Sequence, residues 1–282
     1  MADSPLDNYR KQSYETWETL ANVWAAERDF RTRTSDNVNT WLVGKLAPEP
    51  GDTLLELAAG NGETGFIAAA SVGDQGKVIS TDFSPQMVET ARSAGEERGL
   101  TNLEYRVVDA EHMELGDDSV DGVICRFGYM LMADPAAALA ETRRVLRPGG
   151  RLVFSVWGPP DRNPWVSRLG RLAVERGLMP PPQPGMPGIF ALADQDRIRS
   201  LVTGAGFGEP QIDELALEWT FGSFDEYFDF AARSVGPVAI AMREVSEADI
   251  LKMRDALRER MSEFEGDEGF RVPRLCLNVA TQ

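Results

Sequence analysis

The chain has 282 residues, of which 43% are hydrophobic and 26% charged, so it is long enough for a large domain with a sizeable core. Its 45 Asp and Glu outnumber its 29 Lys and Arg, and the formal net charge is -16. Because nucleic-acid binding relies on basic groups that neutralise phosphates, this acidic balance argues against a nucleic-acid partner.

The N-terminal part of the chain is predicted to be helical. Apolar residues recur at helical spacing through residues 7–46, and the breaker sequence Pro48-Glu49-Pro50-Gly51 follows them. We therefore expect residues 1–46 to form an N-terminal helical cap and residues 47–282 to form the main domain.

Short apolar segments then alternate with helical ones. The expected strands are residues 53–58, 77–81, 103–108, 120–125 and 151–157, and the expected helices are 63–71, 84–98 and a segment from Asp134 that stops before Pro148. This alternation indicates βαβ units, right-handed crossovers and a doubly wound, mostly parallel α/β sheet.

The pattern loosens in the C-terminal part of the chain. The expected elements there are helices at 163–176 and 194–205, a Pro/Gly-rich loop at 179–188, and strands at 211–221 and 271–281. Residues 223–264 are mostly helical and charged, and we interpret them as an insertion, or lid, before the last of seven strands.

A glycine-rich turn follows the first expected strand, where ligands bind in open α/β sheets. Gly60, Gly62 and Gly65 give the spacing G-x-G-x-x-G, which is also typical of a dinucleotide pyrophosphate site. Asp82 lies 20 positions beyond Gly62, where a ribose-binding carboxylate belongs. A tight turn without a ligand and a solvated surface Asp are the alternative interpretations.

Acidic residues end three successive strands. Asp109, in the run Val108-Asp109-Ala110-Glu111, can accept a hydrogen bond from an adenine amino group. Glu56, near the end of the first strand, would repel a pyrophosphate but attract an ammonium or a sulfonium. Together with Asp82, these acids favour a cationic nucleoside over NAD.

These motifs resemble those of class I S-adenosylmethionine-dependent methyltransferases. Residues 54–62 resemble the first motif of that family, 82–87 the second and 109–111 the third, while 144–152 are similar to the approach to its fifth strand. The resemblance covers about residues 45–160 and is closest to the ubiquinone/menaquinone-biosynthesis-like subgroup. It implies a Rossmann-like fold with an antiparallel last strand, S-adenosylmethionine as cofactor, and a small organic methyl acceptor.

The resemblance also implies cofactor-binding roles. Glu56 would organise the methionine amine end through water or backbone, and Asp82 would hold the ribose hydroxyls. Ala58, where the family often has glycine, would line the methionine and ribose with its neighbours. The full expected set is Glu56, Ala58, Gly60, Gly62, Asp82, Phe83, Met87, Asp109, Ala110, Glu111 and Arg126, with Phe83 and Met87 flanking the adenine.

The acceptor side is less informative. His112, the only histidine, is a weak candidate for a general base, and an exposed position or a place beside the cofactor is the alternative. Tyr129 is a weak candidate for orienting the substrate, with core packing as the alternative. Asp134 is the nearest acid, and one ligand does not make a site, so we predict no catalytic metal.

Aromatic residues of the cap, the Pro-rich region and the insertion are further candidates for an acceptor wall, with packing of these covers onto the core as the alternative. They are Trp17, Trp24, Trp165, Phe190, Trp219, Phe224 and Tyr227. An NAD(P)-dependent oxidoreductase and a non-catalytic cofactor-binding protein remain competing hypotheses. The sequence has no apolar run of ~18 residues and no signal peptide, and we interpret its two cysteines as free thiols. We therefore predict a cytoplasmic protein without a membrane span. The oligomeric state is left unspecified.

Overall fold

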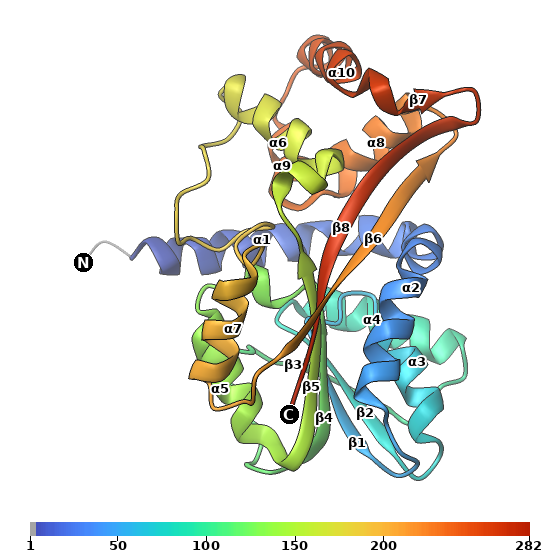
Figure 1. Cartoon of the computed structure of the whole chain (residues 1–282). Helices are drawn as coiled ribbons and strands as arrows, with labels where there is room; N and C mark the ends of the chain where they lie inside the picture. Colours follow the sequence, from blue (N-terminus) through green and yellow to red (C-terminus); the bar gives the residue numbers. More distant parts are fainter. Residues whose placement is uncertain (1–3) are drawn as a thin grey trace.

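Eight strands form one sheet in the computed structural model, which describes residues 4–282 (Figure 1). The strands are β1 (Thr53–Leu57), β2 (Lys77–Asp82), β3 (Leu103–Val107), β4 (Val120–Arg126), β5 (Leu146–Trp157), β6 (Gln211–Phe221), β7 (Glu265–Gly266) and β8 (Gly269–Thr281). The main path through the sheet is β3-β2-β1-β4-β5-β8-β6, and β7 pairs with β8. Because the strand order reverses between β1 and β4, their carboxyl ends mark the crevice where such sheets bind ligands.

The sheet is parallel except at β8, which runs antiparallel to both β5 and β6. The predicted mostly parallel sheet with an antiparallel last strand is therefore confirmed, and the two-residue strand β7 adds an eighth member. β5 begins earlier than the expected residue 151, because Leu146 already pairs with Val120 before the register shifts to Arg151 opposite Gly122.

Helices cover both faces of the sheet and its carboxyl end. They are α1 (Pro5–Ala26), α2 (Arg28–Leu46), α3 (Glu63–Val72), α4 (Pro85–Glu97), α5 (Pro135–Val145), α6 (Pro164–Glu175), α7 (Gln195–Gly204), α8 (Phe224–Ser234), α9 (Gly236–Arg243) and α10 (Glu247–Met261). Two expected starts are confirmed by their caps, since Ser84 accepts from the Met87 amide and Asp134 from the Ala136 and Ala137 amides. Among residues 4–282, none of the helices is sufficiently long and apolar to cross a membrane.

Figure 1 shows α5 and α7 on one side of the sheet and α2, α3 and α4 on the other. The strands between these layers are largely buried, as expected for a doubly wound sheet. Helix α1 lies across the carboxyl end of the sheet, and α6, α8, α9 and α10 lie beyond it. The described part of the expected cap, residues 4–46, forms α1 and α2, and residues 1–3 lie outside the described range.

The paired strands β6 and β8 project past the carboxyl end of β5. Trp157, the last residue of β5, lies opposite Cys276, so β8 continues as a two-stranded ribbon with β6 before that point. Within this projection, Leu217 pairs with Arg274 and Phe221 with Phe270. The ribbon thereby carries side chains from the edge of the sheet over the crevice.

Candidate functional site

A cavity of about 1080 Å³ opens over the carboxyl ends of the strands. Residues that follow β1, β2, β3 and β4 line its floor, while α1, the segment around residues 179–191 and α9 contribute its other walls. Its position at the β1/β4 switch point is that of ligand sites in doubly wound folds. The acidic strand tips predicted from the sequence therefore lie beside a real cavity, with one exception.

Asp82 lies at the floor of this cavity and is 6% exposed. Its carboxylate accepts hydrogen bonds from the Gly60 and Ser84 amides, each at 3.0 Å. A carboxylate has about four acceptor positions, so further positions remain for ligand hydroxyl groups. Burial raises the pKa of Asp82 to about 6. Because this value still lies below 7, the carboxylate is mostly ionised at neutral pH and above.

Glu56 is the exception, because it is 2% exposed and does not line the cavity. Its carboxylate accepts from the Gly65 amide at 2.7 Å and from the Ser80 hydroxyl at 2.8 Å. Direct contact with a ligand is thus excluded in this arrangement. The side chain supports the glycine-rich turn from behind, and burial raises its pKa to about 7.

The raised pKa of Glu56 gives a stability prediction. The folded state holds this proton more tightly than the unfolded chain, so stability is lost as pH rises from about 4.5 to about 7. Glu56→Gln, which cannot ionise, should therefore be more stable than wild type at pH 8 by up to roughly 3 kcal/mol, and nearly equal at pH 4.5. Urea unfolding at both pH values measures this, and an equal difference at the two would contradict it.

The glycine-rich turn uses left-handed backbone at Ala58, Gly60 and Gly62, with φ of 51°, 55° and 82°. Ala58 and Gly60 line the cavity, as expected, and Gly60 lies against the Trp24 ring. Gly62 faces away from it, because a Cβ there would lie 2.8 Å from Phe66. Gly62 therefore permits helix packing and does not contact the cavity.

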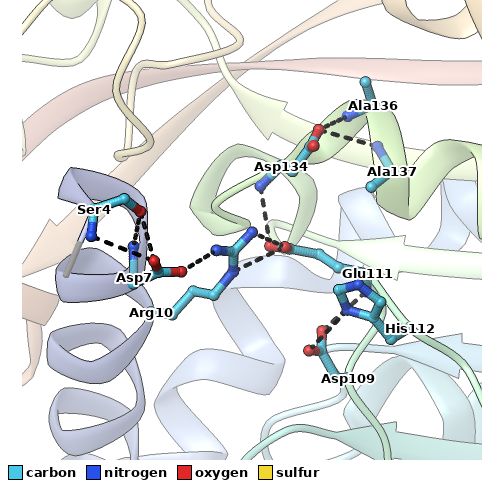
Figure 2. A network of polar contacts seen from close by, with 9 residues as sticks. All are labelled: Ser4, Asp7, Arg10, Asp109, Glu111, His112, Asp134, Ala136 and Ala137. Carbon is cyan, nitrogen blue, oxygen red and sulfur yellow. Dashed lines mark hydrogen bonds and ion pairs between the residues drawn. The ribbon is translucent and has the colours of Figure 1, made fainter. Parts of the chain in front are cut away.

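The segment after β3 joins the cap to the sheet (Figure 2). Glu111 is 6% exposed and accepts from Arg10 Nη2 of α1 at 2.7 Å and from the Asp134 amide at 3.0 Å. Asp109 and Ala110 line the cavity beside it. The side chain of His112 is 76% exposed, lies 3.6 Å from Asp109, and does not line the cavity. This position does not suit a general base.

The Arg10–Glu111 pair predicts how firmly α1 is held. Arg10→Met leaves the buried Glu111 carboxylate without its guanidinium partner, and hydrogen bonds to charged groups contribute about 1.5–3 kcal/mol each. Amide hydrogen exchange in α1 should accelerate on the order of tenfold, while exchange in α7 stays unchanged. Arg147→Met, at an exposed position of β5, is the control. Equal protection of α1 in wild type and both variants would refute this role of Arg10.

Phe83 and Met87, the expected adenine flank, both line the cavity after β2, and their contact with adenine stays a prediction. Met87 is 1% exposed, and Phe83 makes an edge contact with Tyr14 of α1 at 6.0 Å between ring centroids. The cap therefore closes over the apolar flank. This contribution of Tyr14 was not expected from the sequence.

Two candidate residues at and just after the end of β4, Arg126 and Tyr129, differ in their position relative to the cavity. Arg126, at the end of β4, lines the cavity and forms an ion pair with the buried Glu63 at 2.5 Å. Tyr129 is fully buried, hydrogen-bonds the Thr142 hydroxyl at 2.6 Å, and does not line the cavity. The suggestion that Tyr129 orients a substrate is therefore wrong for this structure, and core packing explains the residue.

Five of the seven aromatic candidates do line the cavity, and two do not. The lining residues are Trp17, Trp24, Trp165, Phe190 and Trp219. Phe224 and Tyr227 instead pack on Phe270 of β8. Sequence reasoning missed Trp157, which ends β5 and stacks on Phe127 at 4.2 Å; its position at a strand end was the signal that could have identified it.

Comparison with known proteins finds similarity in the part of the chain that contains β1–β5. Residues 48–160 match a family model described as a methyltransferase domain. This matched segment begins before β1 and ends after β5. Over 109 residues it is 38% identical to an arsenite methyltransferase of Halobacterium salinarum, covering 39% of this chain and 28% of that protein. Over 115 residues it is 34% identical to the ubiquinone/menaquinone biosynthesis C-methyltransferase of Teredinibacter turnerae, covering 40% and 46%.

The matches confirm the expected resemblance to the ubiquinone/menaquinone-biosynthesis group, although the chain spans less than half the length of either relative. Among solved structures, the YcgJ protein of Bacillus subtilis is 19% identical, with a TM-score of 0.62 over 87% of this chain and 97% of that one. At this identity the likeness concerns the fold. It extends beyond the matched domain to most of the chain.

Proposed function

We propose that the chain is an S-adenosylmethionine-dependent methyltransferase that acts on a small organic acceptor. The observation that carries the proposal is one continuous cavity, which joins acid-tipped strand ends to aromatic walls. Because the match spans less than half of the curated relatives, the activity rests on this geometry together with the methyltransferase domain.

The residues at the strand ends fit a cationic nucleoside cofactor. Asp82 presents free acceptor positions beside the turn, Asp109 lines the cavity after β3, and Phe83 gives an apolar flank between them. Each acid that lines this cavity lies at the end of β2 or just after β3. An NAD pyrophosphate would bring further negative charge to these acids, whereas an adenosyl sulfonium is attracted.

The protein's contribution to the reaction is alignment and exclusion of water. When bound, S-adenosylmethionine supplies a methyl group on positively charged sulfur, which an acceptor displaces in line. Trp24 and Tyr9 of α1 and Trp165 of α6 enclose the space in which acceptor and cofactor meet. Apolar walls of this kind strengthen the electrostatic interactions inside and hold the reactants within about 3–3.5 Å.

We assign the covering role to the cap (residues 1–46), the loop near residues 180–190 and the insertion 223–264 of the 47–282 domain. In support, α1, residues 179–191 and α8–α9 all contribute lining residues. Ligand binding should order the loop, so S-adenosylhomocysteine should slow its proteolysis several-fold. Equal cleavage with and without this ligand counts against closure.

The setting proposed for the enzyme is the cytoplasm, with a small molecule as the partner. Cys125 and Cys276 are buried free thiols, which suit a reducing compartment. A net charge of -16 disfavours nucleic acid.

Calorimetric titration tests the proposed function against its rivals. We expect S-adenosylhomocysteine to bind with micromolar or tighter affinity and NADH to bind at least a hundredfold more weakly. Preferential NADH binding would favour the oxidoreductase alternative. Tight S-adenosylhomocysteine binding without methyl transfer to any member of a broad acceptor panel would favour a non-catalytic protein.

A further inference from the structure

Acidic and basic side chains both line the cavity, and Arg10 already pairs with Glu111 on its acidic side. Its three acids lie at the ends of β2 and β3, whereas its most buried basic side chains, Arg31, Arg126 and Arg274, come from α2, β4 and β8. If a cationic cofactor binds beside the acids, the basic side chains are available to the other reactant or to another part of the cofactor. The partners of the three arginines show which of them is available.

Two of these arginines already form an ion pair with a carboxylate of the protein. Arg31 of α2 pairs with Glu27, the residue before that helix, at 3.0 Å. It also lies 3.7 Å over the ring of Trp24, which contacts the glycine-rich turn at Gly60. Arg126 pairs with Glu63 at 2.5 Å. Their charges are compensated by the protein before any ligand arrives.

Arg274 has no carboxylate within ion-pair distance among residues 4–282, although it is 2% exposed. Its Nη2 donates to the Thr34 carbonyl oxygen, while Nε and Nη1 are buried without a hydrogen-bond partner. Its guanidinium lies 3.9 Å from the centroid of Trp219 and 6.0 Å from that of Trp157. A buried charge without a counter-ion is costly, so the fold retains Arg274 at the expense of stability.

The strand pattern shows that this placement is specific. In the projecting part of β8, Phe270 and Val272 are buried and Arg271 is exposed, so Arg274 occupies the inward, otherwise apolar face. The guanidinium can pair with a planar anion. Trp157 and Trp219, which stack on Phe127 and Phe30, line the cavity with apolar indole surface that can contact an aromatic ring. Both features describe one kind of ligand.

We infer that the methyl acceptor is an aromatic carboxylate whose carboxylate binds Arg274 while its ring lies against Trp157 and Trp219. This inference rests on the proposed methyltransferase function and names its substrate class. The carboxylate is the recognised group, and Arg274 is a binding and specificity residue.

The alternative partner for Arg274 is the methionine carboxylate of the cofactor. Four steps across the sheet, β2-β1-β4-β5-β8, separate the strand of Asp82 from that of Arg274. At ~4.8 Å per step the backbones of these two strands are about 19 Å apart, and the cofactor measurements below distinguish the two partners.

The test compares Arg274→Gln with Arg271→Gln, a control on the same strand whose side chain is exposed and pairs with Glu268. Benzoate and salicylate are titrated into protein saturated with S-adenosylhomocysteine, and benzamide and salicylamide serve as their neutral counterparts. Wild type and R271Q should bind the carboxylates at least tenfold more tightly than the amides. R274Q should lose that preference.

Cofactor affinity is measured in the same proteins with S-adenosylhomocysteine and with 5′-methylthioadenosine, which lacks the amino-acid carboxylate. R274Q should bind both as wild type does. Loss of S-adenosylhomocysteine affinity with retained methylthioadenosine affinity would assign Arg274 to the cofactor and overturn the inference. So would a wild-type protein that binds no member of the panel, or binds acids and amides equally.

Arg274→Met, which keeps the volume but removes the charge, guards against a folding defect. Its melting temperature without ligand should equal or exceed that of wild type, because an uncompensated charge is removed. A fall of several degrees would show a structural role and overturn the inference. If wild type fails to bind S-adenosylhomocysteine, the proposed function fails, whereas carboxylate preference in the ligand-free protein still reports on Arg274.

Discussion

Asp82→Asn should weaken S-adenosylhomocysteine binding by on the order of 100- to 1000-fold at pH 8. The ionised carboxylate accepts from the Gly60 and Ser84 amides and offers its remaining acceptor positions to the cavity. An amide has a single acceptor oxygen and no charge, so it cannot fill both roles. Two charged hydrogen bonds lost at about 1.5–2 kcal/mol each, the lower part of the usual range for charged groups, give this range.

The raised pKa of Asp82 also predicts how the binding affinity depends on pH. Because Asp82 titrates at about 6, wild-type affinity should fall as the pH drops below that value, and the variant should not show this fall. Isothermal titration between pH 5 and 8 provides the measurement. Asp74→Asn, at an exposed turn, is the matched control. An affinity of D82N within threefold of wild type at pH 8 would contradict the electrostatic explanation of the site.

Gly65→Ala is the substitution with the next largest expected effect. A Cβ at this position would lie 2.2 Å from Oε2 of Glu56, whose carboxylate also accepts from the Gly65 amide. Both groups are buried, so either the start of α3 or Glu56 must move. We expect a loss of about 1–3 kcal/mol in unfolding free energy, together with weaker cofactor binding.

Two variants separate this clash from the general cost of replacing a glycine. Gly44→Ala in α2, where a Cβ meets nothing within 4 Å, should stabilise the protein by roughly 0.5–1 kcal/mol. Glu56→Ser removes the obstructing carboxylate, so the G65A/E56S double variant should lose less stability than the two single variants summed. Strict additivity would show that the two residues do not interact as described.

The cofactor half of the site was predictable because its signals are local in sequence. Gly60, Asp82 and Asp109 follow successive strands, and parallel strands place their carboxyl ends at one edge. The same logic overestimated Glu56, because position in a strand does not show whether a side chain points into the cavity or beneath the turn. It also left His112 and Tyr129 as candidates until exposure and core burial placed them elsewhere.

The sequence by itself determined the doubly wound sheet and the acid-tipped edge, because hydrophobic periodicity and turn residues act over short distances. The antiparallel last strand was expected only from the resemblance to the methyltransferase family. Only the tertiary structure shows which side chains face that acid-tipped edge across the cavity. Arg10 meets Glu111 across 101 positions, and Arg274 reaches the cavity only because the β6–β8 ribbon continues past the end of β5. Such pairings depend on the path of the chain in space, and a single sequence carries no local pattern that specifies them.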